Sequence, residues 1–338
     1  MNVRSSRKRK IRECMLIDAV IPAHKKDADT IDLCIEGIRN NVKDINRIIV
    51  VSKDRLTEKA EFYSEELFPF SFEDVGNIIG FHRKTFNYYG GLIQTTSAAV
   101  IPDLQRDVLV CDADTIFLKP VQFVDGDVGL YNVSYDVPLG VTSHPYFEHF
   151  EKLIPGLTKQ TQYSGICHHM LIQKDILLDM FCLVEEVHQM PFWKADISVT
   201  LEDYESLRPK PPHDQAPLLF TTYELYLNYV MKFHPDRCRI RQQRSILAYK
   251  GRMGVEGEEI QKVGSRTNLW GNVQILPKEE ENKFEFNSFK ESCEYIAKRC
   301  AELGWDAVTF QNHTRIGSKK HKEACLEEID ELFRNNPT

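Results

Sequence analysis

The stretch DVLVCDADTIFLKP, residues 107–120, joins a short apolar run to two aspartates that stand two positions apart. The run at residues 107–111 predicts a buried β-strand, and Asp112 and Asp114 follow it directly. On an extended backbone, residues two apart point the same way, so both carboxylates face one side. Because ligands of open α/β sheets collect at the carboxyl ends of strands, we expect a site at this position.

Strand and helix patterns alternate before this motif. Residues 15–23 are a short apolar run that contains Pro22, and residues 48–52 are β-branched and continuous, as is typical of a parallel strand covered on both faces. Between them, residues 30–42 repeat apolar side chains at helical spacing. This β-α-β opening predicts an α/β fold with a mixed, mostly parallel sheet flanked by helices.

Further elements follow from the same periodicities. The patterns predict strands at residues 128–131 and 164–173, and helices at 87–100, 146–153, 175–188, 221–233, 288–303 and 319–333. The last two helices would belong to a C-terminal helical extension.

Composition excludes several classes of protein. With 42% hydrophobic and 28% charged residues, the 338-residue chain should build a substantial core. The formal net charge of -7 gives no reason to expect nucleic acid as a partner. The nine cysteines form no CxxC pair, which favours buried free thiols over disulfides or zinc. We expect a cytoplasmic protein whose basic N-terminal tip touches a membrane surface at most peripherally, since no apolar run approaches the ~20 residues of a span.

The aspartate pair suits a divalent metal ion. Mg²⁺ and Mn²⁺ prefer oxygen ligands, and substrate phosphates often complete their shell. When a sugar leaves a diphosphate, negative charge builds on the phosphate, and a metal ion stabilises that charge. Ala113 is small enough to let a donor approach the backbone. The alternative is a pair of aspartates that only ends a strand and begins a turn; the apolar strand before the pair favours the metal site.

With these residues in view, the chain resembles a GT-A glycosyltransferase, and within that class the GT-A-like DUF6492 group. The resemblance implies a metal-dependent enzyme that uses Mn²⁺ or Mg²⁺. Its reaction would move a sugar from a nucleotide diphosphate sugar, by expectation a UDP-sugar, to a hydroxyl of a glycan or glycolipid acceptor. The similar stretches are VIPA (20–23), NYYGG (87–91), VCDADT (110–115), SGICHH (164–169) and TYELY (222–226).

The same resemblance implies a domain organisation and a donor site. A basic flexible tail (1–13) would precede a GT-A domain (14–251), whose donor half runs to about residue 130 and whose acceptor half starts at 131, and a partly helical extension (252–338) would follow. Asp112 and Asp114 would bind the metal, with Asp114 also counted as catalytic. Arg83 and Lys84 would contact the donor phosphates, although a solvated basic turn is the alternative. The donor-site residues are therefore Ala23, His24, Ser52, Arg83, Lys84, Asp112 and Ala113.

The sequence offers few candidates for a third metal ligand and for contacts with the acceptor. Many GT-A enzymes supply a late histidine as third ligand, but residues 245–252 contain none. His168, His169 and His234 are the candidates. Because His168 and His169 alternate faces on a strand, at most one should look into the site, as an acceptor or metal contact; the alternative is one core and one surface histidine. Tyr226 is the further acceptor-site candidate.

Glu224 is the candidate base. An inverting transferase, which we favour, needs a carboxylate to remove the acceptor proton, whereas a retaining enzyme does not. Glu224 follows a proline-rich loop at residues 209–217 and opens a predicted helix. The alternative is a capping box with Thr221, in which the glutamate binds the first turn of its own helix.

Three other functions compete with this prediction. A haloacid-dehalogenase-type phosphohydrolase also uses an apolar strand and DxD, with the first aspartate as nucleophile; here Ile116 departs from its motif and a long α/β segment precedes it. A non-catalytic nucleotide-binding protein on the same fold is the second, since fold alone does not grant activity. A sugar-nucleotide pyrophosphorylase is disfavoured because residues 22–26 lack its glycine-rich loop.

Overall fold

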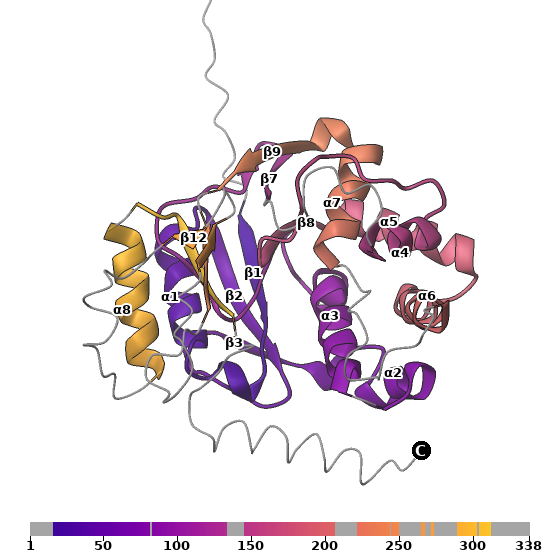
Figure 1. The fold of residues 1–338 in the computed structure, drawn as a ribbon, viewed down its shortest axis with the longest axis horizontal. Coiled ribbons are helices and arrows are strands. Elements are labelled where there is room, and N and C mark those ends of the chain that lie inside the picture. The colour runs from indigo at the N-terminus through magenta and orange to yellow at the C-terminus, as the bar shows by residue number, and fades with distance from the viewer. Residues whose placement is uncertain are drawn as a thin grey trace, which may run out of the picture.

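The structure is a computed structural model of the 338-residue chain, shown in Figure 1. The residues that it describes are 16–81, 83–133, 145–206, 222–243, 245–249, 265–267, 272–273, 289–302 and 304–311. The predicted tail at residues 1–13, the proline-rich loop and the predicted helix at 319–333 lie outside these ranges.

A five-stranded sheet forms the centre of the fold. Its order is β3 (Glu61–Ser64), β2 (Ile45–Ser52), β1 (Ile17–Pro22), β4 (Asp107–Cys111) and β8 (His169–Gln173). The first four strands are parallel, and β8 runs antiparallel to β4. Strands β4 and β8 are buried along their whole length, as apolar strands covered on both faces must be. The predicted mixed, mostly parallel sheet is thus confirmed.

Helices cover both faces of this sheet. Figure 1 shows α1 and α8 on one side and helices α2 to α7 on the other. Among the described residues, no helix combines the length and apolar character needed to cross a membrane. The helices are α1 (Ile31–Asn41), α2 (Phe72–Ile79), α3 (Arg83–Val100), α4 (Pro145–Leu153), α5 (Lys174–His188), α6 (Phe192–Ser206), α7 (Thr222–Phe233) and α8 (Phe289–Glu302), with short 3-10 turns η1 (Lys25–Asp27), η2 (Glu65–Leu67) and η4 (Pro235–Arg237).

Two further sheets, one of three strands and one of five, flank the centre. In the three-stranded sheet, β7 pairs antiparallel with β6 and parallel with β9. The strands of this sheet are β6 (Val124–Asp125), β7 (Val128–Val133) and β9 (Cys238–Gln242). The other sheet has the order β12 (Asn272–Val273), β11 (Ser265–Thr267), β10 (Ser245–Tyr249), β13 (Ala307–Gln311) and β5 (Thr115–Phe117).

The C-terminal part of the chain is built into the same fold. Strand β13 lies between β10 and β5, and β5 begins directly after the aspartate pair. Ile116 of β5 packs in one apolar cluster with Trp305 and with residues of α8 and β13. The predicted boundary at residue 251 therefore cuts through one sheet, and the described part of the extension contains the strands β11, β12 and β13 as well as helix α8. Strand β13 is five residues long and pairs with β5, which lies nearly 200 positions earlier in the chain. The local sequence contains no pattern that predicts such a pairing.

The seven cysteines that the structure describes are all free thiols, and five of them are buried. Cys34 of α1 and Cys111 of β4 both lie within 3.5 Å of the Asp112 carbonyl oxygen. They therefore act as small apolar core residues beneath the aspartate pair.

Candidate active site

The aspartate pair sits where β4 ends, and its backbone is fixed from two sides. The Asp112 N–H donates to the His168 carbonyl at 2.9 Å, and the Asp112 carbonyl accepts from the Thr115 N–H at 3.1 Å. The Asp114 carbonyl accepts from the Phe310 N–H of β13 at 3.0 Å. The C-terminal region thus helps to hold the turn that carries both carboxylates.

The carboxylate of Asp112 is surrounded by donors. Its Oδ1 accepts from Gln94 Nε2 of α3 at 2.5 Å and from the Tyr223 hydroxyl of α7 at 3.0 Å. Its Oδ2 lies 3.0 Å from His168 Nδ1. The Gln94 amide also lies 2.6 Å from the Tyr223 hydroxyl. Three separate parts of the chain therefore fix this side chain in one orientation.

Asp114 differs sharply from its neighbour. Its half-buried carboxylate has no hydrogen bond or ion pair with any residue that the structure describes. Burial, followed by the negative charges of Asp112 and Asp27, raises the pKa of Asp114 to about 7, against the opposing influence of His168 and Lys26. A carboxylate held near other carboxylates without a partner is stabilised in its charged form by a cation.

The donor set fits a cation that a substrate helps to bind. No group of three or more His, Cys, Asp or Glu side chains in the described ranges is arranged to hold a metal ion by itself. Mg²⁺ commonly binds through one or two carboxylates together with substrate phosphates, so two aspartates are a sufficient protein contribution. The unpartnered Asp114 carboxylate fits that mode, and a closed protein cage is not required.

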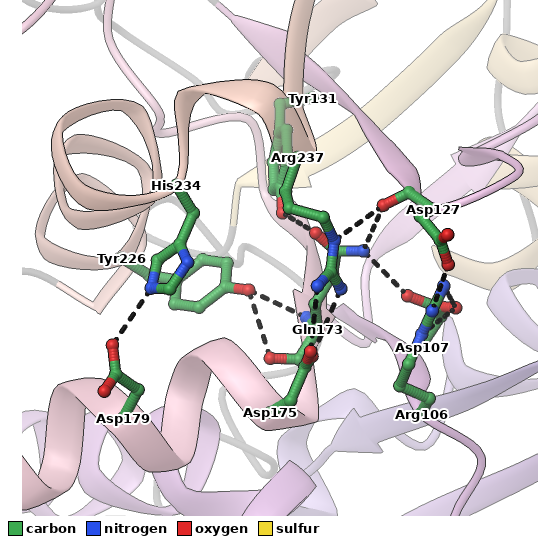
Figure 2. A network of polar contacts seen from close by, with 10 residues as sticks. All are labelled: Arg106, Asp107, Asp127, Tyr131, Gln173, Asp175, Asp179, Tyr226, His234 and Arg237. Carbon is green, nitrogen blue, oxygen red and sulfur yellow. Dashed lines mark hydrogen bonds and ion pairs between the residues drawn. The ribbon is translucent and has the colours of Figure 1, made fainter.

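The two adjacent histidines point to different places. His168 has a φ of 60°, a left-handed conformation that is uncommon outside glycine, and its ring contacts Asp112. His169 is buried in β8, with Nε2 2.7 Å from Asn132 Nδ2, and burial lowers its pKa to about 3. His234 instead contacts Asp179, in the second turn of α5, at 3.0 Å (Figure 2). Of the three candidate third ligands, His168 is the one placed beside the pair.

The predicted strand-end residues meet at one edge of the sheet. Because β1, β2 and β4 are parallel, Ala23, Ser52 and Asp112 all follow carboxyl ends on that edge. The Ser52 hydroxyl donates to the Asp54 carbonyl at 2.7 Å, so this side chain closes its own turn. His24 caps η1: its backbone N–H donates to the Asp27 carboxylate at 2.9 Å, and its ring Nδ1 accepts from the Lys26 N–H at 3.3 Å.

The predicted phosphate contacts lie at the start of α3. Lys84 is half-buried and forms no ion pair with the described residues. It stands ten positions before Gln94, about 15 Å along the helix axis. Lys84 is therefore not brought next to the carboxylates, and the side chain of Arg83 lies outside the described part of the chain.

Glu224 is placed in the interior. Its exposed fraction is 0%, and its Oε1 accepts from the Ser164 hydroxyl and, at 3.1 Å, from the Gly165 N–H. Its Oε2 accepts from Asn228 Nδ2 at 3.1 Å. Burial raises the pKa of Glu224, and these hydrogen bonds oppose that rise. The carboxylate braces the turn before β8 against α7, and both of its oxygens accept hydrogen bonds from the protein.

Tyr226 lies at the opposite end of β4 from the aspartate pair. Its hydroxyl accepts from the Gln173 N–H at 2.7 Å, and Gln173 pairs with Asp107 at the start of the strand (Figure 2). Asp107 and Asp112 are five extended residues apart, roughly 17 Å. The structure therefore does not bring Tyr226 to the site. Tyr223, one turn earlier in α7, is the tyrosine that reaches Asp112.

Sequence reasoning missed two residues that contact the pair, Gln94 and Tyr223. Tyr223 stands within the stretch TYELY that carries the resemblance, but nothing in the pattern distinguishes it from Tyr226. Gln94 is a polar residue that follows the buried Leu92 and Ile93 in α3, which is the available signal that it meets a polar partner.

Solved structures with similar folds share little sequence with this chain. The galactosyltransferase LgtC, as an active-site mutant, is 12% identical with a TM-score of 0.40 over 92% of this chain and 95% of that one. A complex of LgtC with donor and acceptor sugar analogues is 11% identical, with a TM-score of 0.38 over 95% and 96%. Mouse xyloside xylosyltransferase 1 is 10% identical, with a TM-score of 0.33 over 69% and 87%. No protein-family model and no curated protein matches the chain, so we base function on its own residues.

Proposed function

We propose that this chain is a metal-dependent glycosyltransferase that moves a sugar from a nucleotide diphosphate sugar, by preference a UDP-sugar, to a hydroxyl of a glycan or glycolipid. The observation that carries the proposal is the aspartate pair at the carboxyl edge of the sheet. One carboxylate, that of Asp112, is fixed by three donors, while that of Asp114 has no described partner. This division supports a site in which one residue is oriented in advance and the other is free to bind.

Asp112 and Asp114 would hold the Mn²⁺ or Mg²⁺ ion. Such an ion, when bound, withdraws negative charge from the departing diphosphate. Gln94 and Tyr223 would keep the Asp112 carboxylate from rotating, which limits the reorganisation needed when the donor arrives. The donor would lie along the edge formed by the ends of β1, β2 and β4.

Glu224 would act as a positioning residue. Both of its oxygens accept hydrogen bonds from the protein, and the turn that it braces at Ser164 and Gly165 leads directly to His168. Because His168 adopts a left-handed backbone conformation, it needs support from its surroundings to stay in place. The phosphohydrolase alternative is less well supported, since Ile116 departs from its motif and a long α/β segment precedes Asp112.

Metal-dependent nucleotide binding tests this proposal most directly. We expect one nucleotide among UDP, GDP, dTDP and CMP to raise the thermal midpoint of the full chain by several degrees only when Mn²⁺ is present, since a ligand at ~100 times its dissociation constant adds about 2.7 kcal/mol. Asp114→Asn should abolish this metal-dependent rise.

Glu58→Gln is the matched control, because it also removes one negative charge, from a side chain that is 86% exposed. It should respond as the wild type does. An equal rise in Asp114→Asn and wild type would contradict the metal site. A positive binding result should be followed by measurement of sugar release from the corresponding nucleotide sugar.

A further inference from the structure

The carboxyl ends of β7 and β9 lie at the same edge of the molecule as the aspartate pair. Near the start of β7, the Asp127 carbonyl accepts from Gln173 Nε2 at 3.1 Å, and near its end Asn132 lies 2.7 Å from His169. Strand β7 therefore runs antiparallel to β8, which itself runs antiparallel to β4. Since β9 is parallel to β7, both strands end where β4 ends.

A buried polar network occupies this end of the two strands. Arg241 Nε donates to Asn132 Oδ1 at 2.7 Å, and Asn132 Nδ2 donates to Gln243 Oε1 at 2.9 Å and towards His169 Nε2. Asn132, His169 and Gln243 are all buried. The direction of these bonds fixes the amide of Gln243: its oxygen faces Asn132, so its nitrogen faces away from the network.

Three donors of this network remain without a partner. Arg241 Nη2, Gln243 Nε2 and His169 Nδ1 are buried and have no hydrogen-bond partner in the described structure. His169 Nδ1 carries the ring proton because Nε2 accepts from Asn132.

The Arg241 guanidinium forms no ion pair with a described carboxylate, and the Phe123 ring lies 5.3 Å from its Cζ. Burial lowers the pKa of Arg241 to about 10, although the negative charge of Asp306 opposes this shift without contacting the guanidinium. A partly buried guanidinium that lacks a direct ion pair is costly and is normally paired.

We infer that Arg241 and Gln243, held in place by Asn132, form a binding site for an oxyanion such as a phosphate or a carboxylate. The unpartnered nitrogens of both residues can only donate hydrogen bonds, so the complementary ligand must accept several. A planar guanidinium fork matches phosphate and carboxylate oxygens in particular. A water molecule would satisfy a donor but would leave the guanidinium without a direct ion pair. The site uses none of the residues of the aspartate pair, so it goes beyond the proposed transferase chemistry.

Inorganic phosphate and acetate, added to the full chain in EDTA at constant ionic strength, probe this site without a metal. We expect both to raise the thermal midpoint, and titration calorimetry to give a measurable affinity. Arg241→Met should weaken that affinity at least tenfold, the size expected for loss of a charge-assisted hydrogen bond.

Arg239→Met is the matched control, since it removes the same charge from the same strand. The Arg239 side chain is 61% exposed and pairs with Asp125 at 3.4 Å, away from the network. Its phosphate response should equal that of the wild type. An equal loss in Arg239→Met and Arg241→Met would overturn the inference, because it would mean that only the net charge of the strand matters.

Gln243→Glu tests the site without removing Arg241. The new carboxylate would keep the oxygen that accepts from Asn132 and add a negative charge to the network that holds the Arg241 guanidinium. We therefore expect a higher thermal midpoint in anion-free buffer and no further rise with phosphate. A variant that still responds to phosphate as the wild type does, or a wild type with no response to either anion, would overturn the inference.

Two further measurements complete the test. The first identifies which kind of anion the site binds, and the second shows whether the site is independent of the proposed metal site. If UDP in EDTA also binds less tightly to Arg241→Met, the site takes a nucleotide phosphate; if only phosphate and acetate are affected, it takes a separate acidic group. Asp114→Asn should keep the full phosphate response. Failure of the metal-dependent chemistry in that variant therefore leaves this inference standing.

Discussion

The two ends of β4 are built in opposite ways. At the amino end, the side chains in Figure 2 satisfy one another: Asp107 pairs with Arg106 at 2.8 Å and accepts from Gln173 at 3.1 Å. At the carboxyl end, Asp114 has no described partner, and His168 adopts a left-handed backbone conformation. Strained or unsatisfied groups persist where function requires them, whereas complete networks stabilise the fold. The comparison predicts that the amino end of β4 contributes to stability and that the carboxyl end carries the proposed chemistry.

Substitutions at the two ends should give opposite results, and these are the largest effects we expect. Asp114→Asn should lower kcat/KM for sugar transfer by about 10²–10³-fold, the scale of losing a group that stabilises transition-state charge. Its free energy of unfolding near neutral pH should be no lower than that of the wild type, since no contact is lost and the substitution removes a carboxylate whose pKa is raised in the fold.

Asp107→Ala should do the reverse. It leaves one buried N–H of Gln173 without its acceptor and removes one of the two carboxylates that bind Arg106, so it should lower the free energy of unfolding by about 1–3 kcal/mol. Metal-dependent nucleotide affinity of the folded protein should not change. Urea unfolding and nucleotide titration measure the two quantities, and the comparison fails if Asp107→Ala loses affinity while keeping its stability.

Glu224 could serve either stability, as Asp107 does, or chemistry, as Asp114 does. The Glu224→Gln variant distinguishes these two roles. If Glu224 braces the turn before His168, an amide group placed against the Ser164, Gly165 or Asn228 donors should lower the free energy of unfolding by about 1–3 kcal/mol. The pH dependence of transfer should then keep its shape. A variant with wild-type stability, a much lower kcat and an altered pH profile would instead identify Glu224 as the base.

A third buried cluster should make stability depend on pH. His149 of α4 lies between Asp196 at 2.8 Å and Asp203 at 3.1 Å, both on α6, and Asp203 also pairs with Lys152. Although burial opposes it, these carboxylates raise the pKa of His149 to about 9. A raised pKa adds stability below the unfolded value of about 6.5, and this stability is lost as the pH rises through about 9.

The free energy of unfolding should therefore fall by on the order of 1–3 kcal/mol between those limits. His149→Gln, which has no proton to lose in this window, should remove most of that slope. Urea unfolding at several pH values measures it. A slope that persists unchanged in the variant would place the titrating group elsewhere.

Local sequence patterns predicted most of the central layer and the place of the site. Continuous apolar runs found β1, β2 and β4, and the rule that ligands gather at strand ends placed Asp112 and Asp114 correctly at an edge. Tertiary placement decided the rest. Whether Tyr223 or Tyr226 meets Asp112 depends on how α7 packs against α3 and β8, and β13 pairs with β5 across a long stretch of chain. Neither the packing of α7 nor the pairing of β13 with β5 produces a periodic pattern in the local sequence.

The smallest expected effect concerns Asp127 and shows which contacts stabilise the network at the amino end of β4. Asp127 lies at the rim of the network, 75% exposed, and pairs with Arg106 at 2.6 Å. Asp127→Ala should cost no more than about 0.5–1 kcal/mol, because exposed ion pairs are screened by water and salt. The loss should shrink further in 1 M NaCl, whereas the effect of Asp107→Ala should not. Equal losses in the two variants would mean that the network is stabilised by long-range charge rather than by buried hydrogen bonds, and the contrast between the two ends of β4 would then be electrostatic in origin.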